Sequence, residues 1–210
     1  MALRNEVCQV GSDAVAIQTD IAARDAPSKI LGATLASFNT DGVDILVNNV
    51  GVGQNTPLED VTTEEYDMLM EVNVRALLFM TQAFVQKVRP GGRIVNISSI
   101  SARGGYATQT VYAATKAAVE AMTKVWAKEL GQKYQITVNA INPGPVDTDM
   151  YRAAGEVHLA RMEEANRQTP AGARAGTAQD IADIVCFLCE ERSRWVTGDV
   201  VCANGGMLFT

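Results

Sequence analysis

Short apolar runs alternate with longer segments of helical periodicity along most of this chain. The apolar runs predict strands at 14–19, 43–48, 92–98, 136–141 and 199–203. The periodic segments predict helices near 25–39, 62–88, 110–133, 150–167 and 178–190. Because the strand-like runs are apolar at consecutive positions, both faces of the sheet are expected to be covered. The order of elements predicts a doubly wound α/β fold around a parallel sheet, with a Rossmann-like arrangement.

Local signals support the helix expected at 62–88. Thr62 or Thr63 can cap its first turn, and the two glutamates that follow favour a helix N-terminus. The turn-forming residues 90–92 are expected to end this helix and lead the chain into the next strand.

Composition fits one domain over residues 1–210, because 47% apolar residues in a chain of this length can build a sizeable core. The net charge of −6 argues against nucleic acid or an acidic membrane surface as a partner. No apolar stretch reaches the length of a membrane span, and the first residues carry no signal-peptide pattern. A cytoplasmic protein is therefore expected.

Cysteine and histidine usage gives little support to a metal site. Cys186 and Cys189 form a C-x-x-C pair inside an apolar helical run, so packed core thiols are expected. His158, the single histidine, lies in a polar stretch and is expected to be exposed on a helix. A zinc hydrolase and a Ser-His-Asp enzyme are therefore poorly supported.

The strongest chemical signal is the pair Tyr112 and Lys116, preceded by Ser99. Residues four apart on a helix project from the same face. A nearby ammonium group stabilises a phenolate and is expected to move the phenol pKa toward the range of efficient acid–base catalysis. A serine hydroxyl beside the phenol can hydrogen-bond the same substrate oxygen. These groups suit protonation of a carbonyl oxygen.

Several further segments carry a resemblance to a known family. They are Asn48-Asn49-Val50-Gly51, Val72-Asn73-Val74-Arg75, Ile97-Ser98-Ser99, Pro143-Gly144-Pro145-Val146-Asp147-Thr148, Trp195-Val196-Thr197-Gly198 and Asn204-Gly205-Gly206. Together with the Tyr/Lys pair they resemble the short-chain dehydrogenase/reductase family over nearly the whole chain. The segments at 73–75, 148–151 and 185–188 are most similar to fungal polyhydroxynaphthalene reductases and 3-oxoacyl carrier-protein reductases.

The resemblance implies specific roles. The implied catalytic residues are Asn73, Ser99, Tyr112 and Lys116. The implied cofactor-binding residues are Asp20, Ile21, Asn49, Gly51, Arg75, Tyr112, Lys116, Pro143, Gly144, Val146 and Thr148. The implied cofactor is NADP, with NAD possible by the same analogy, and the implied substrate is a small ketone or secondary alcohol. The family also implies a homodimer or homotetramer and no resident metal.

Most of these residues also have a purely structural interpretation. Asn49 can satisfy turn backbone, and Asp20 can cap a turn at a strand end. Asn73 in an apolar helix needs a hydrogen-bonding partner or a water. Only spacing distinguishes Ser99 from Ser98 beside it.

The resemblance also implies an N-terminal piece that the sequence does not contain. The family opens with a strand, a glycine-rich turn, a helix and a second strand, whereas residues 1–7 resemble the end of the helix that follows that second strand. The missing first strand would lie beside 43–48. Three explanations are open: a sequence that is incomplete, which we favour; a strand 14–19 that slides in beside 43–48; or an edge that a partner chain covers. Without the glycine-rich turn at a helix N-terminus, dinucleotide binding is expected to be weak.

Two functions follow as hypotheses. The first is an NADP-dependent ketone reductase of small-molecule or polyketide metabolism. The alternative is a non-redox protein on the same scaffold, either a Tyr/Lys isomerase, dehydratase or cyclase, or an inactive partner subunit.

Overall fold

The computed structural model describes residues 2–53 and 55–209, and its centre is a sheet of parallel strands. The strands are β1 (Val43–Asn48), β2 (Val88–Ile97), β3 (Thr137–Pro143) and β4 (Val200–Ala203), and they lie in the order β1-β2-β3-β4. All three pairings are parallel. The predicted parallel sheet is therefore confirmed.

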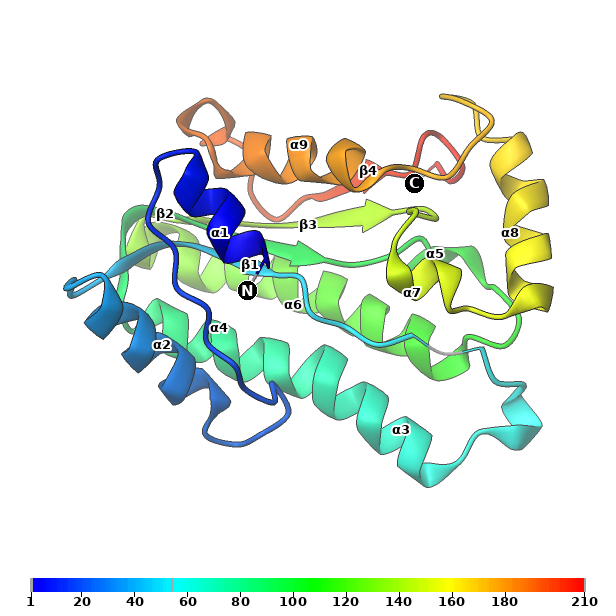
Figure 1. Cartoon of the computed structure of the whole chain (residues 1–210), viewed down its shortest axis with the longest axis horizontal. Helices are drawn as coiled ribbons and strands as arrows, with labels where there is room; N and C mark the ends of the chain where they lie inside the picture. Colours follow the sequence, from blue (N-terminus) through cyan, green and yellow to red (C-terminus); the bar gives the residue numbers. More distant parts are fainter. Residues whose placement is uncertain (1, 54, 210) are drawn as a thin grey trace.

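Helices cover both faces of this sheet (Figure 1). The helices of the described residues are α1 (Ala2–Gln9), α2 (Ala26–Ser37), α3 (Thr63–Met70), α4 (Leu77–Val85), α5 (Ser101–Gly104), α6 (Thr110–Tyr134), α7 (Asp149–Arg152), α8 (Glu156–Arg167) and α9 (Ala178–Cys189). The described residues also form three short helical turns, η1 (Leu58–Asp60), η2 (Glu71–Ala76) and η3 (Glu191–Ser193). Helices α4 and α6 pack on one face of the sheet, and α9 packs on the other, as expected for a doubly wound fold.

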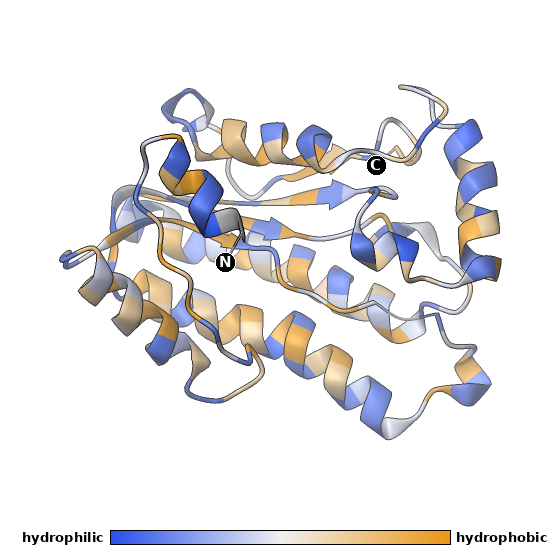
Figure 2. Cartoon of the chain, in the orientation of Figure 1, coloured by the Kyte–Doolittle hydropathy of each residue, from blue (hydrophilic) through white to orange (hydrophobic). Residues whose placement is uncertain are grey.

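Alternation along β2 divides the core between these two faces. Ile94 packs with Phe84 and Val138 beneath α6, whereas its neighbour Val95 packs with Ile141 and Leu188 beneath α9. Successive side chains of a strand point to opposite faces, so β2 supplies both clusters. Figure 2 shows that α4, which packs on the sheet, is mostly apolar, whereas α8, which lies beyond the end of the sheet, is mostly polar.

The strand predicted at 14–19 is wrong. Among the described residues, 12–20 form an extended but unpaired segment, and β1 pairs only with β2. An isolated extended segment has no ladder of hydrogen bonds, so its apolar residues alone do not make it a strand. The hypothesis that this segment slides in beside β1 is therefore wrong as well. Ile45 and Val47 on β1 are 49% and 40% exposed.

Two further boundaries differ from the predictions. Strand β2 begins at Val88 instead of 92, so it includes Pro90, and the pairing shifts register between Val43 and Ile45 where this irregular start meets β1. The helix predicted at 150–167 is two helices, α7 and α8. They are separated at Gly155, whose φ of 86° is incompatible with a continuous right-handed helix.

The helix predicted at 62–88 runs from Thr63 to Val85 and contains a π-helical turn, η2, in its middle. The Thr62 hydroxyl caps it by accepting a hydrogen bond from Glu65 N. By length and composition this helix would also suit a membrane span, with 39% of the relevant window buried. Here it packs as a core helix against α2, α6 and β1.

The prediction of packed core thiols is confirmed for one of the two cysteines, Cys189. Cys189 packs against the cluster beneath α9. Cys186 is exposed, and both cysteines are free thiols. Among the described residues no group of metal-ligating side chains comes together.

Candidate active site

Polar side chains form a ladder inside the carboxyl end of the sheet. Asn48 Nδ2 donates to Asn96 Oδ1 at 2.8 Å and to Thr81 Oγ1 at 3.0 Å, and Asn96 Nδ2 donates to Thr123 Oγ1 at 2.9 Å. Asn48 therefore joins β1 to β2 and α4, and it does not serve the local turn. Because buried amides must be paired, this ladder fixes where the chain leaves β1 and β2.

Asn73 lies in the π-helical turn η2 and is directed at the loop after β1. Its Nδ2 donates to Val52 O at 2.9 Å and to Thr115 Oγ1 at 3.1 Å, and its Oδ1 accepts from Val52 N at 2.8 Å. The side-chain amide is therefore fully engaged with protein groups. π-Helical turns inside α-helices are common at functional sites.

Gly51 lies between Asn73 and Lys116. A Cβ at this position would lie 3.3 Å from Asn73 Oδ1 and 3.4 Å from Lys116 Nζ. The absence of a side chain therefore lets the loop after β1 lie close to both groups. The ammonium group is a hydrogen-bond donor, so it can bind a hydroxyl oxygen of a ligand that reaches it.

Ser99 and Tyr112 form the second part of the site. The Tyr112 side chain hydrogen-bonds Ser99, and Ser99 Oγ also accepts from Ser101 N at 3.1 Å. Ser101 Oγ in turn donates to Gln109 Oε1 at 2.7 Å. Burial raises the pKa of the Tyr112 phenol, and the hydrogen bond with Ser99 opposes that rise. The expected fall of this pKa is therefore not observed, because burial outweighs the polar contacts.

Lys116 is buried one helical turn beyond Tyr112. Its Nζ donates to Ile97 O at 2.8 Å and lies 5.7 Å from the centre of the Tyr112 ring. Burial lowers the pKa of Lys116 to about 8, because an ammonium ion loses hydration inside the protein. At neutral pH the group is still mainly charged.

Sequence reasoning missed Thr115, which is fully buried between the two catalytic candidates of α6. Its hydroxyl donates to Tyr112 O at 2.7 Å and accepts from Asn73 Nδ2. It also missed Glu120, whose carboxylate is buried behind Ser98. Spacing was the available signal for Glu120, since it lies one turn after Lys116 on the same helix.

Asp20, Ile21 and Arg75, which the resemblance implies in cofactor binding, make their contacts outside this cluster. Asp20 is exposed, and its Oδ1 accepts from Ala22 N at 3.0 Å, while Ile21 beside it is half-buried. Arg75 Nη1 donates to Ala22 O at 3.2 Å and to Glu71 Oε2 at 3.1 Å. Arg75 thus ties the turn that carries Asp20 to η2.

Asn49 is also exposed, at the turn after β1. Its side chain lies on the surface, and the neighbouring Asn48 is the buried residue of the two.

The residues predicted after β3 form a loop beside the loop after β1. Pro143 O accepts from Ile100 N at 2.9 Å, and a Cβ on Gly144 would lie 3.2 Å from Asn204 Cβ. Val146 forms a bridge with Gly176.

Thr148 caps α7, the helix that follows this loop, by accepting from Tyr151 N at 3.4 Å. A Cβ on Gly53 would lie 3.8 Å from Met150 Sδ of that helix, so the two loops are neighbours. Thr148 is half-buried, and its hydroxyl also donates to Val146 O.

An open cavity of about 370 Å³ lies between the loop after β1 and α8. Its lining includes Asn55, Thr108, His158 and Arg161. His158 is half-buried rather than exposed, and burial and the nearby Arg161 both lower the pKa of its imidazole.

Residues 2–208 match the family model described as enoyl-(acyl carrier protein) reductase. The chain is 46% identical over 207 residues to the short-chain dehydrogenase/reductase FrzI of a Cladobotryum species, covering 97% of this chain and 79% of that protein. It is 39% identical over 213 residues to the hydroxynaphthalene reductase-like protein Arp2 of Metarhizium anisopliae, covering 96% and 78%.

Among solved structures, the chain is similar to a blue fluorescent protein from a metagenomic library in complex with NADPH. The TM-score is 0.90 at 38% identity, covering 99% of this chain and 81% of the other. The chain therefore belongs to the short-chain dehydrogenase/reductase family and is an oxidoreductase of that family.

Proposed function

We propose that this protein is an NADP-dependent oxidoreductase that interconverts a small ketone and a secondary alcohol in the cytoplasm, in small-molecule or polyketide metabolism. The observation that carries the proposal is the hydrogen bond between Tyr112 and Ser99 beside the buried ammonium group of Lys116. The resemblance to a protein solved with NADPH supports NADP as the cofactor.

Tyr112 is the proton donor to the carbonyl oxygen. Because burial raises its pKa, the phenol is protonated at neutral pH and can donate. Ser99 hydrogen-bonds the same oxygen and orients it. When bound, the nicotinamide supplies the hydride, which the protein's own residues cannot provide.

Lys116 binds the nicotinamide-side ribose and keeps a positive charge near the phenol as it loses its proton. A ribose hydroxyl can accept a hydrogen bond from this ammonium group, and glycine at position 51 avoids a side-chain contact with its Nζ. Asn49, Pro143, Gly144, Val146 and Thr148 contribute from the adjoining loops, and Asp20, Ile21 and Arg75 contribute at the adenine end.

Asn73 supports the proton relay through its backbone rather than its side chain. Its amide is committed to Val52 and Thr115. Asn73 lies in the π-helical turn η2, and such turns inside α-helices are common at functional sites, which supports this role.

NADPH titration of the chain, followed by nicotinamide fluorescence, tests the cofactor assignment. We expect a dissociation constant no tighter than roughly 100 μM, or about −5.5 kcal/mol, because no glycine-rich helix N-terminus is available for the pyrophosphate among the described residues. Ketone-dependent oxidation of saturating NADPH tests the reaction. Binding without reduction of any ketone in a broad panel would favour the non-redox alternative.

A further inference from the structure

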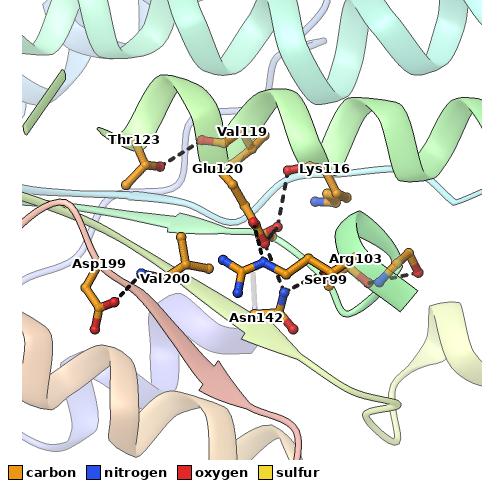
Figure 3. A network of polar contacts seen from close by, with 11 residues as sticks. Ser99, Arg103, Lys116, Val119, Glu120, Thr123, Asn142, Asp199 and Val200 are labelled. Atoms are coloured by element: carbon orange, nitrogen blue, oxygen red, sulfur yellow. Dashed lines mark hydrogen bonds and ion pairs between the residues drawn. The ribbon is translucent and has the colours of Figure 1, made fainter. Parts of the chain in front are cut away.

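Glu120 places a carboxylate in the interior of the protein, one helical turn beyond Lys116 on α6 (Figure 3). It is 6% exposed. Its Oε1 accepts from Ser98 Oγ at 3.1 Å and from Asn142 Nδ2 at 2.9 Å, and its Oε2 accepts from Arg103 Nε at 2.7 Å. These donors come from the end of β2, the end of β3 and helix α5. One carboxylate therefore ties three elements to α6.

The Asn142 amide links this carboxylate to Ser99. Its Nδ2 donates both to Glu120 Oε1 and to Ser99 O, each at 2.9 Å. Asn142 Oδ1 is buried without a hydrogen-bond partner among the described residues. A flipped amide would place that oxygen against two other oxygens, so the two acceptors determine the orientation of the amide despite its unpaired oxygen.

Ser98 links the carboxylate to Lys116. Its hydroxyl lies 3.1 Å from Glu120 Oε1 and 3.3 Å from the backbone oxygen of Lys116, so both can serve as its acceptor. Ser98 and Ser99 follow β2 directly, and their hydroxyls contact α6 at different turns. Ser98 is fixed against Glu120, while Ser99 contacts Tyr112.

Arg103 completes the network from α5, which begins two residues after Ser99 in the chain. Its ion pair with Glu120 is partly buried, with the two side chains 25% and 8% exposed. Because Arg103 pairs with it, the Glu120 carboxylate presents no uncompensated negative charge to Lys116. The carboxylate is therefore better suited to hold neighbouring groups in place than to act as the counter-ion of the lysine.

We propose that Glu120 is a positioning residue whose Oε1 holds the Asn142 amide on the Ser99 backbone and so fixes the Ser99 hydroxyl that bonds Tyr112. Its consequence for turnover rests on the proposed ketone reduction, but the positioning itself does not. Removal of the Oε1 acceptor frees the Asn142 amide, and the segment from Ser99 to Ser101 loses one of its anchors.

The test uses two substitutions that separate shape from hydrogen bonding. Glu120→Gln keeps an acceptor oxygen for Asn142 and Ser98 but loses the charge that pairs with Arg103. Glu120→Leu keeps a similar volume and loses all acceptors. Glu129→Leu, at an exposed position of the same helix, is the matched control.

Two measurements on the chain without cofactor report directly on the position of Ser99 and its neighbours. The first is the NMR signal of Tyr112 in protein with ¹³Cζ-labelled tyrosine, assigned among the five tyrosines by its loss in Tyr112→Phe. The second is hydrogen exchange of the Ile100 and Ser101 amides, which bond Pro143 O and Ser99 Oγ. Glu120→Leu should shift the Tyr112 signal and speed exchange about tenfold, the effect of weakening roughly one hydrogen bond. Glu120→Gln and Glu129→Leu should match wild type.

Unchanged Tyr112 and amide signals in Glu120→Leu would overturn the proposal, as would equal changes in Glu120→Gln and Glu120→Leu. If Glu120→Leu does not fold, Asn142→Ala must give the same changes with Glu120 intact, and unaltered signals there would refute it. In an active preparation, Glu120→Leu should lower kcat about tenfold at an unchanged KM. A wild type that reduces no ketone would contradict the proposed function and leave the NMR result decisive for the positioning.

Discussion

Asn73 and Val52 form a reciprocal pair: the side-chain amide of Asn73 donates to Val52 O at 2.9 Å and accepts from Val52 N at 2.8 Å. The pair joins the π-helical turn of the long core helix to the loop after β1. It satisfies both backbone groups of Val52 in place of a strand ladder. The loop that carries Gly51 is therefore held at a fixed distance from α6.

Asn73→Leu is expected to destabilise the fold by about 3 kcal/mol, because it leaves both Val52 backbone groups and the Thr115 hydroxyl without their partner. Urea unfolding measures the loss. Thr115→Val, which removes only one of the three contacts, should cost about 1 kcal/mol. Equal losses in the two variants would mean that the Val52 pair contributes nothing.

Gly51→Ala is expected to destabilise the fold around the site, because the new methyl would lie 3.3 Å from Asn73 Oδ1 and 3.4 Å from Lys116 Nζ. Asn73 is held by three hydrogen bonds and cannot move freely. We expect a loss of about 1–2 kcal/mol in unfolding free energy, as for other overpacked positions. NADPH affinity should fall as well.

Gly32→Ala is the control for this change. Gly32 lies in α2 with nothing within 4 Å of the new methyl. Alanine should stabilise that helix by up to about 1 kcal/mol. A Gly51→Ala variant as stable as wild type, with unaltered NADPH affinity, would contradict the close approach.

Tyr112→Phe is expected to lower kcat by about 10²–10⁴-fold, the usual contribution of a positioned proton donor. Unfolding free energy should change little, since the ring is retained. Steady-state ketone reduction at saturating NADPH measures the effect. More than about a tenth of wild-type turnover would exclude Tyr112 as the donor.

Because of Lys116, the free energy of unfolding should rise with pH between about 8 and 10.5. Its pKa is lowered from 10.5 to about 8, so in this window the unfolded chain binds a proton that the folded chain has released. Below pH 8 both states are protonated, and the cost of burying the charge is fully present. The rise amounts to at most about 3 kcal/mol.

Urea unfolding of wild type and Lys116→Met from pH 7 to 9.5 measures this difference. That range lies below the ionisation of Tyr112, whose pKa is raised by burial. The variant should lack the rise. Parallel pH profiles in the two proteins would show that Lys116 keeps its ordinary pKa in the fold.

The chain is expected to form a homodimer or homotetramer through α6 and the preceding long helix, which runs from Thr63 to Val85. Ala114, Ala117, Ala121 and Val125 are all exposed and lie at spacings of three and four, on one face of α6. Ala121→Glu should shift the assembly toward the 22.5 kDa monomer in light scattering. Ser28→Glu, which adds the same charge on α2, should not. A wild type that is monomeric at tens of micromolar would remove this prediction.

The parallel sheet and most helices could be predicted from sequence because period and capping are local signals. Thr62 caps its helix through its own side chain, and β3 is buried along its whole length, as expected for a parallel strand covered on both faces. The pair Tyr112 and Lys116 could be recognised because helical geometry alone puts residues four apart on one face.

Tertiary structure decided the features that depend on distant partners. Residues 14–19 have the composition of a strand, but a strand exists only where a neighbour pairs with it, and no sequence window contains that neighbour. Contacts across 21 to 42 positions of the chain produce three further features. They are the π-helical turn at Asn73, the different contacts of Ser98 and Ser99, and the burial of Glu120. The sequence by itself was enough to recognise Ser99, Tyr112 and Lys116 as site residues. Packing decided which way each one points, because orientation is set by the hydrogen bonds that a buried polar group must find.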